Sequence, residues 1–291
     1  MSRYKKSQLI FLTPCLFFLL SLSILPFICT ICLSFFSGRG NNLEFSGLSN
    51  YFILLQDDAF LSAFLNSLIF TAIIVPVIIT ICILVALLIQ RIESNRIRQI
   101  VLVVLYIPCI TSPIAYSLFF KQIAYSDGIL SSFLRLTMIV SDNYNILQDP
   151  WGARLLIAFV CIWAWFGFYV LLLSNAMRNI DSEIYSVAKL DGASHITIFR
   201  KIVFPQIRPI LLLIIILSTI NTFQIYIESA IITKGGPGMA TLTLGTELYK
   251  VSFTYVAQYG YSASIGVVIF LVSIIMTAIV LIYMRKHEQK Y

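Results

Sequence analysis

Charged residues are scarce in this sequence. Asp, Glu, Lys and Arg make up only 11 % of its 291 residues, whereas about 25 % is usual in water-soluble domains. Hydrophobic residues make up 59 %, and the mean hydropathy is +0.92. This composition excludes a soluble domain built around one core, and it predicts a polytopic membrane protein whose apolar surface faces lipid and other helices.

Residues that carry catalysis are also few. The only histidines are His195 and His287, which are far apart, and the sequence contains no GxxxxGK[ST] phosphate-binding loop. No grouping of acids, bases and nucleophiles typical of an enzyme is present. We therefore expect no catalytic residue, no metal site and no cofactor.

The cysteines all lie inside apolar runs. None of them is therefore in a setting typical of metal binding or redox chemistry. Two of them form a C-x-x-C pair, but within a membrane segment and without a neighbouring histidine. We interpret all six as small apolar packing residues: Cys15, Cys29, Cys32, Cys82, Cys109 and Cys161.

Six apolar segments are long enough to cross a bilayer, which takes about 20 residues in a helix. We predict an all-α protein with six transmembrane helices at residues 9–36, 63–90, 99–120, 155–177, 210–232 and 262–284. Residues 1–62 would hold a short tail, the first helix and an outer loop. Residues 63–284 would form the transmembrane core, and 285–291 a second tail.

The net charge of +7 is sorted by loop. With these spans, 14 of the 20 Lys and Arg residues fall on one side: Arg3, Lys5, Lys6, Arg91, Arg96, Arg98, Arg178, Lys189, Arg200, Lys201, Arg208, Arg285, Lys286 and Lys290. The positive-inside rule assigns that side, which includes both termini, to the cytoplasm. Sorting of this kind indicates a lipid bilayer and not a nucleic acid as the partner.

The loop at 178–209 is too highly charged to lie in hydrocarbon, yet it has the pattern of folded structure. Asp181 is a good N-cap, and Gly192 can end a helix with a positive φ. Ser194 can cap a second short helix that runs to Pro205. Ile184, Val187, Ala188 and Asp191 fall at helical spacing and would give the first helix a narrow apolar face. Such a face suits the groove of a partner protein.

The spacing of this loop resembles a known motif. Ser186-Val187-Ala188, three residues, Gly192, nine residues and Ile202-Val203-Phe204-Pro205 are similar to the cytoplasmic Glu-Ala-Ala loop of ABC importer permeases. In that family the loop carries a coupling helix that docks into the ATPase subunit. The resemblance assigns this role to Glu183, Ile184, Tyr185, Ser186, Val187, Ala188, Asp191, Gly192, Ala193 and Pro205. Ser186 replaces the family's Glu, and Glu183 lies one turn earlier.

A second motif follows the fifth span. Thr233, Gly235-Gly236-Pro237 and the run from Thr241 to Leu244 resemble the T-x-G-G-P…T-x-T-L pattern of carbohydrate-type permeases. Gly-Gly-Pro also predicts a tight turn at the membrane edge. The resemblance is to the first of the two permease chains of maltose-type importers. It implies a type I ABC importer permease fold in the cell membrane, with a second permease chain, two ATPase subunits that hydrolyse the ATP, and an external solute-binding protein.

Two stripes of residues are candidates for a substrate path. In the fifth span these are Ser218, Asn221, Thr222, Glu228 and Ser229, with Gln224 at the border of the stripe; in the fourth they are Cys161, Trp165 and Phe168. Several of these positions coincide, by resemblance, with the sugar site of maltose-type permeases. Aromatic faces suit the C–H faces of sugars, but helix packing and interhelical hydrogen bonds would explain the same residues.

Alternatives remain at this point. Within the family, the substrate could be glycerol-3-phosphate or another polyol instead of a sugar. Outside it, an ion-coupled secondary carrier would place acidic residues or His at mid-membrane, whereas Glu228 is the only acidic residue within a predicted span. A structural or channel-forming membrane protein would leave the 178–209 loop unexplained.

Overall fold

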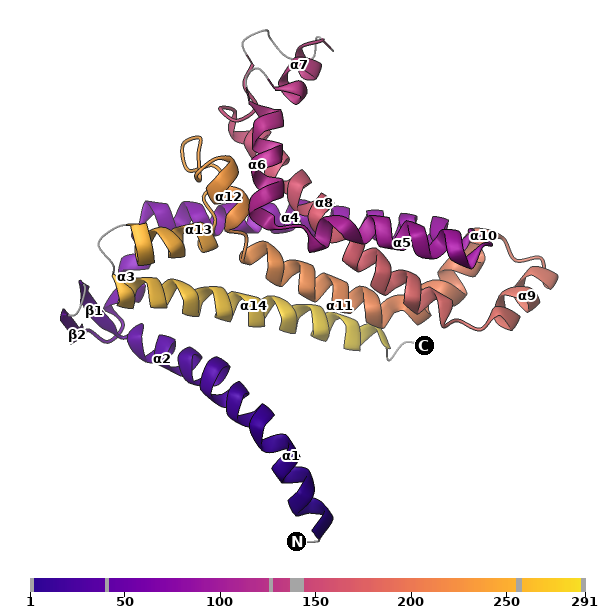
Figure 1. Ribbon diagram of the computed structural model, residues 1–291, viewed down its shortest axis with the longest axis horizontal. Helices are drawn as coiled ribbons and strands as arrows, with labels where there is room; N and C mark the ends of the chain where they lie inside the picture. The colour runs from indigo at the N-terminus through magenta and orange to yellow at the C-terminus, as the bar shows by residue number, and fades with distance from the viewer. Residues whose placement is uncertain (1–2, 40–41, 126–127, 137–143, 255–257, 289–291) are drawn as a thin grey trace. The chain divides into compact units, whose positions relative to one another are not determined.

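The computed structural model describes residues 3–39, 42–125, 128–136, 144–254 and 258–288. The chain divides into two compact units, one made of Met1–Leu61 and Glu247–Val272, the other of Ser62–Thr246 and Ser273–Tyr291. Figure 1 shows their elements. Within these described residues, five helices are long and apolar enough to cross a membrane, or six if one bent pair counts as a single span.

The first unit begins with one nearly continuous helical run and then a hairpin. Its elements are α1 (Arg3–Leu19), the π-helical segment η1 (Leu20–Ile24), α2 (Leu25–Leu33), β1 (Phe36–Arg39), β2 (Asn42–Phe45), α3 (Ser49–Leu54) and the π-helical segment η3 (Lys250–Thr254). Helices α4 (Asp58–Gln90), α13 (Leu244–Tyr249) and α14 (Tyr259–Glu288) contribute residues to both units.

The first predicted span extends too far, because Phe36 begins a strand. Strand β1 pairs with β2 in antiparallel register, with Phe36 opposite Phe45. The amide of the buried Asn50 donates to the main-chain oxygens of Ser34 and Phe36, at 2.8 and 2.7 Å. These bonds satisfy carbonyls that follow the last helical turn, so the helix stops there. Apart from this hairpin the described protein is helical, as predicted.

The second unit contains the remaining elements. These are α5 (Asn95–Ile110), α6 (Pro113–Ala124), α7 (Ile129–Leu136), α8 (Pro150–Arg178), α9 (Ser182–Leu190), α10 (His195–Ile198), the π-helical segment η2 (Phe199–Val203), α11 (Phe204–Phe223) and α12 (Ile227–Ile232). The second and fourth spans are confirmed, with starts a few residues earlier than predicted. At α8, Asp149 caps the helix by accepting from Gly152 N, and Pro150 occupies the first turn.

The third predicted span is not one straight helix. Helices α5 and α6 are bent relative to each other by more than 40°. Thr111 and Ser112 between them have ψ values of 142° and 127°. A residue that precedes proline is pushed out of the helical region, and Pro113 follows Ser112. The proline therefore ends one helix and starts the next.

The fifth span is also broken, which corrects the assumption of a single helix over 210–232. Helix α11 ends at Phe223, and Tyr226 has a non-helical conformation at φ −136°, ψ −58°. The main-chain oxygen of Ile225 accepts a hydrogen bond from Thr243 Oγ1. Residues before and after the break therefore do not share one helical face.

Helix α8 lies against both α5 and α11 in the core of the second unit (Figure 1). A Cβ on Gly167 would lie 1.8 Å from the main-chain oxygen of Leu105 in α5, so only glycine permits this approach. Small residues at such crossings let helices pack through van der Waals contact in lipid. This packing fixes the ends of the spans, where the candidate sites lie.

Candidate functional site

The 178–209 loop folds as the sequence predicts at its first helix. The Asp181 side chain accepts a hydrogen bond from Glu183 N at 2.9 Å and caps α9. Gly192 has φ +74°, and the next helix is capped by Ser194, whose Oγ accepts from Thr197 N at 3.2 Å. Each of these three predictions is confirmed.

Two backbone hydrogen bonds close the C-terminus of α9. Gly192 N donates to Lys189 O, and Ala193 N donates to Ala188 O, both at 3.0 Å. This pair of bonds is the Schellman motif, which needs a left-handed residue at the position of Gly192. The direction in which the chain leaves α9 is therefore set by local structure.

Helix α9 exposes an apolar face that differs from the predicted one. Ile184, Val187 and Leu190 are 41 %, 57 % and 87 % exposed, and their spacing of three residues places them along one side of the helix. Ala188 was predicted on this face, but it is buried in the core of the second unit. Leu190 was missed, although its position three residues after Val187 indicates the same face.

The other predicted coupling residues fall on other sides of the loop. Glu183, Asp191 and Gly192 are exposed, and Ala193 is partly buried. Tyr185 is partly buried against the core, and this burial raises the pKa of its hydroxyl. Ser186 lies within α9, but its side chain is outside the described part of the chain.

The second helix of the loop was predicted to run to Pro205, but it does not end there. Helical structure continues from His195 through η2 into α11. The N–H of Phe204 bonds to Phe199 O, five residues back, and Pro205 falls in the first turn of α11. Proline lacks an N–H and is tolerated in a first turn, so the wider π turn before it lets the helix continue.

A recess of about 280 Å³ opens where the two broken spans meet. It is lined by Pro113, Tyr116, Trp165, Asn221, Gln224, Ile225, Tyr226, Ile227 and Glu228. The two interruptions create it, because the bend before Pro113 and the break after Phe223 turn main chain and polar side chains toward one place. Figure 1 shows α6 and α12 side by side there.

A buried hydrogen bond stands in the wall of this recess. Tyr116 Oη donates to Glu228 Oε1 at 2.5 Å, and both side chains are about 5 % exposed. Glu228 was noted in the sequence as a polar residue of the fifth span. Tyr116 was missed, because nothing in the sequence shows that α6 turns toward α12.

The predicted path residues fall into two groups. Trp165, Asn221 and Gln224 line the recess, and Asn221 donates to Tyr169 Oη at 3.1 Å. The remaining predicted residues are not among those that line it: Cys161, Ser218 and Thr222 are fully buried, and Phe168 is partly buried with its ring centroid 5.5 Å from that of Tyr169.

Ser218 and Thr222 make hydrogen bonds within the protein. Ser218 Oγ donates to Ile215 O at 3.1 Å. Thr222 Oγ1 donates to Thr219 O at 2.7 Å and lies 2.7 Å from Thr71 Oγ1 in α4. The contact between Thr222 and Thr71 is the interhelical bonding that was the alternative to a path lining, whereas the bond of Ser218 stays within α11. A role for either residue in contact with substrate stays a prediction.

The Gly-Gly-Pro segment forms a tight turn, as predicted, with φ +86° at Gly235. Thr241 holds the turn: its Oγ1 donates to Gly236 O at 2.6 Å, and its main-chain oxygen accepts from Ser229 Oγ at 2.6 Å. The threonines of the T-x-G-G-P…T-x-T-L pattern therefore have a structural role.

Two polar side chains attach this turn to the spans. Asn66 Nδ2 of α4 donates to Met239 O and Leu242 O, at 2.7 and 3.0 Å. Arg154 of α8 donates to Asn66 Oδ1 and to Ala240 O, both at 2.9 Å. The turn is thereby held against α4 and α8. Among the described residues, no group of three or more His, Cys, Asp or Glu side chains could hold a metal ion.

Comparison with known proteins places this geometry in context. The model of one family, described as the binding-protein-dependent transport system inner membrane component, matches residues 7–289. A lactose transport system permease protein of Rhizobium radiobacter is 30 % identical over 276 residues, which cover 94 % of this chain and 92 % of that protein. An arabinooligosaccharides transport system permease protein of Bacillus subtilis (strain 168) is 27 % identical, over 94 % of this chain and 87 % of that protein.

Solved structures are similar over nearly the whole chain. One is the crystal structure of a bacterial ABC transporter involved in the import of the acidic polysaccharide alginate; it matches with a TM-score of 0.81 at 20 % identity, covering 97 % of this chain and 96 % of that one. Another, of that kind of transporter in complex with an alginate pentasaccharide-bound periplasmic protein, matches with a TM-score of 0.79 at 20 % identity, covering 95 % and 93 %. This likeness confirms the predicted fold.

Proposed function

Because the chain belongs to the family of binding-protein-dependent transport system inner membrane components, we propose that it is the permease subunit of an ATP-driven importer for a sugar or oligosaccharide. The relatives named for lactose and for arabinooligosaccharides support this substrate class. The family also favours an ATP-driven importer over an ion-coupled carrier. A carrier of that kind would need acidic residues within its spans. If the first turn of each described span is left out, Glu228 is the only one, and it is hydrogen-bonded to Tyr116.

The recess is the observation that carries the choice of substrate. It combines the Trp165 ring with the amides of Asn221 and Gln224. Aromatic faces contact the C–H faces of a sugar, while amides bind its hydroxyls. Among the described residues that line the recess there is no Lys or Arg, and the only carboxyl group is that of Glu228. A phosphorylated polyol needs cations, so this lining favours a neutral sugar over glycerol-3-phosphate.

The exposed face of α9 supplies the contact with the ATPase. Ile184, Val187 and Leu190 form an apolar strip on a helix that stands in a polar loop. A short helix with such a strip suits a groove on a partner. The assembly would contain this chain, a second and different permease chain, two ATPase subunits and an external solute-binding protein. Glu183, exposed beside the strip, is a candidate for the carboxylate that the family places at Ser186.

The orientation follows from the sorting of basic residues, with the 178–209 loop and both termini in the cytoplasm. A single cysteine at position 194 should resist an impermeant thiol reagent on intact cells, and one at position 238 should react, in a background without the six native cysteines. The reverse pattern would overturn this orientation.

Uptake of a labelled neutral oligosaccharide by cells that express the complete importer tests the proposed substrate path. Trp165→Ala and Gln224→Ala should each lower uptake about tenfold, because loss of a well-placed anchor costs about 1.4 kcal/mol or more. Trp165→Phe should retain most of the uptake. Phe253→Ala, at an exposed aromatic outside the recess, serves as the control. Normal uptake in both recess variants would show that these residues only pack the helices.

A further inference from the structure

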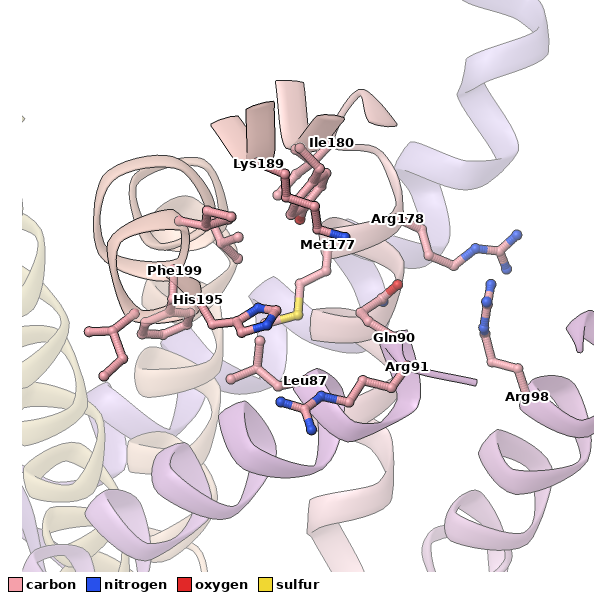
Figure 2. Close-up of a pocket in the computed structure, with 14 residues that line it drawn as sticks. Leu87, Gln90, Arg91, Arg98, Met177, Arg178, Ile180, Lys189, His195 and Phe199 are labelled. Carbon is pink, nitrogen blue, oxygen red and sulfur yellow. The ribbon is translucent and has the colours of Figure 1, made fainter. Parts of the chain in front are cut away.

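A second and larger cavity, of about 670 Å³, is lined by residues at the opposite ends of the spans from those of the recess. Figure 2 shows the side chains that line it. Its polar lining is mostly basic. Arg91, Arg98, Arg178, Lys189 and His195 line it, together with Gln90 and Tyr185, and no Asp or Glu is among the described residues that line it. We call it the basic cavity.

The basic groups come from separate elements. Arg91 follows α4, Arg98 lies in α5, Arg178 ends α8, Lys189 lies in α9 and His195 begins α10. These residues come from parts of the chain that are far apart in the sequence, and the fold brings them together around the cavity. Arg96, Arg200 and Lys201 belong to the same loops and helix ends, but they do not line the cavity.

The arginines of the basic cavity indicate a site for an anionic ligand. Figure 2 shows the guanidinium groups of Arg98 and Arg178 turned toward each other, and like charges repel unless an anion lies near them. Two nitrogens of Arg98 donate to Asn95 Oδ1 and Ile92 O, which fixes its guanidinium at the wall of the cavity.

The remaining lining indicates what carries the anion. Leu87, Met177, Ile196, Phe199 and Val203 give the cavity an apolar wall. A free phosphate ion gains nothing from such a wall, whereas the glycerol backbone and first methylene groups of a lipid would be desolvated against it. Basic pockets between transmembrane helices on the cytoplasmic side are suited to anionic lipid head groups.

We propose that the basic cavity binds the phosphate-bearing head group of an anionic phospholipid. Arg98, Arg178 and Lys189 hold the phosphate, with Arg91 and His195 across the cavity, and the apolar wall receives the start of the acyl chains. The location in the inner leaflet rests on the proposed orientation of the chain. Tyr185 and Lys189 belong to α9, so the bound lipid also connects the coupling helix with the ends of α4, α5 and α8.

Native mass spectrometry of the full-length chain, purified from nanodiscs of equimolar phosphatidylglycerol and phosphatidylcholine, tests the proposal. The wild type should retain phosphatidylglycerol. The triple variant Arg91→Gln, Arg178→Gln, Lys189→Gln should bind it about a hundredfold more weakly, since each basic residue contributes about 1 kcal/mol to binding an anionic lipid. Arg178→Lys alone should retain it. The measurement needs neither ATPase nor substrate, so its failure would leave the proposed function untouched.

A matched variant, Arg96→Gln, Arg200→Gln, Lys201→Gln, removes the same charge outside the cavity and should retain the lipid. Equal loss in the two triple variants, or none in either, would overturn the proposal. Both variants should melt as the wild type does in phosphatidylcholine alone, which shows that they fold. In the same lipid, added inorganic phosphate should not raise the melting temperature. A rise that the cavity variant abolishes would overturn the assignment to a lipid and identify a free phosphate.

Discussion

The hydroxyl of Tyr116 donates a 2.5 Å hydrogen bond to the carboxyl group of Glu228, and this bond joins the two broken spans. Tyr116 lies in α6, just after the bend at Pro113, and Glu228 lies in α12, just after the break that follows Phe223. Both interruptions therefore end in one buried polar contact. The recess beside it exists because neither span is a straight helix.

Tyr116→Phe should destabilise this part of the protein. The substitution leaves the buried Glu228 carboxyl without its donor, which costs about 1–3 kcal/mol. The purified protein in detergent should therefore unfold at a lower temperature. Tyr125→Phe, which removes the same atom from a ring that is 52 % exposed, should unfold as the wild type does. Equal melting temperatures for both variants would show that the bond does not stabilise the fold.

Gly192→Val should loosen the exit from α9. At φ +74° a side chain with a branched Cβ is strained, by about 1–2 kcal/mol. A Cβ at this position meets nothing within 4 Å, so the cost comes from the backbone alone. Gly192→Asn is the matched control, because asparagine tolerates the left-handed conformation.

Limited proteolysis of the 178–209 loop measures this effect. Cleavage should be faster in the valine variant and unchanged in the asparagine variant. Equal cleavage of all three proteins would show that the left-handed residue does not hold the end of α9.

Glu247 should make stability depend on pH. Burial raises the pKa of its carboxyl group, the nearby Asp57 raises it further, and Lys250 opposes them. Because the folded-state pKa lies above the unfolded value of about 4.5, this contribution to stability is fully present below pH 4.5. It is lost as the pH rises through the folded-state pKa.

Glu247→Gln should therefore melt at a higher temperature than the wild type at neutral pH, and the difference should shrink as the pH falls toward 4.5. Glu44→Gln, at an exposed carboxyl group, should show neither effect. If the melting temperatures of Glu247→Gln and the wild type differed by the same amount at neutral pH and near pH 4.5, this account would be contradicted.

Local structure was predictable where the cause lies in nearby residues. The cap at Asp181, the left-handed Gly192 and the cap at Ser194 each depend on a few neighbouring positions. The turn at Gly235 was predictable for the same reason. The spans followed from hydropathy, which needs only about 20 consecutive residues.

The break in the fifth span could not be read from hydropathy, because it depends on a distant partner. The chain leaves helical geometry at Ile225, whose main-chain oxygen is bonded to Thr243. The predicted stripe from Ser218 to Glu228 required one continuous helix. Because the helix is broken here, the two residues do not share a face. Ala188 was misplaced for a related reason: on an isolated helix it belongs to the apolar face, but the core of the second unit covers it.

The central claim is that the face made by Ile184, Val187 and Leu190 docks onto an ATPase subunit. Co-purification of the cognate ATPase with the permease tests it most directly. Leu190→Asp should lower the recovered ATPase at least tenfold, because burying an apolar anchor contributes about 1.5–3 kcal/mol, while Leu190→Met, which remains apolar, should recover it as the wild type does. Full recovery of the ATPase with Leu190→Asp, in a protein that melts normally, would contradict the assignment of α9 as the coupling helix.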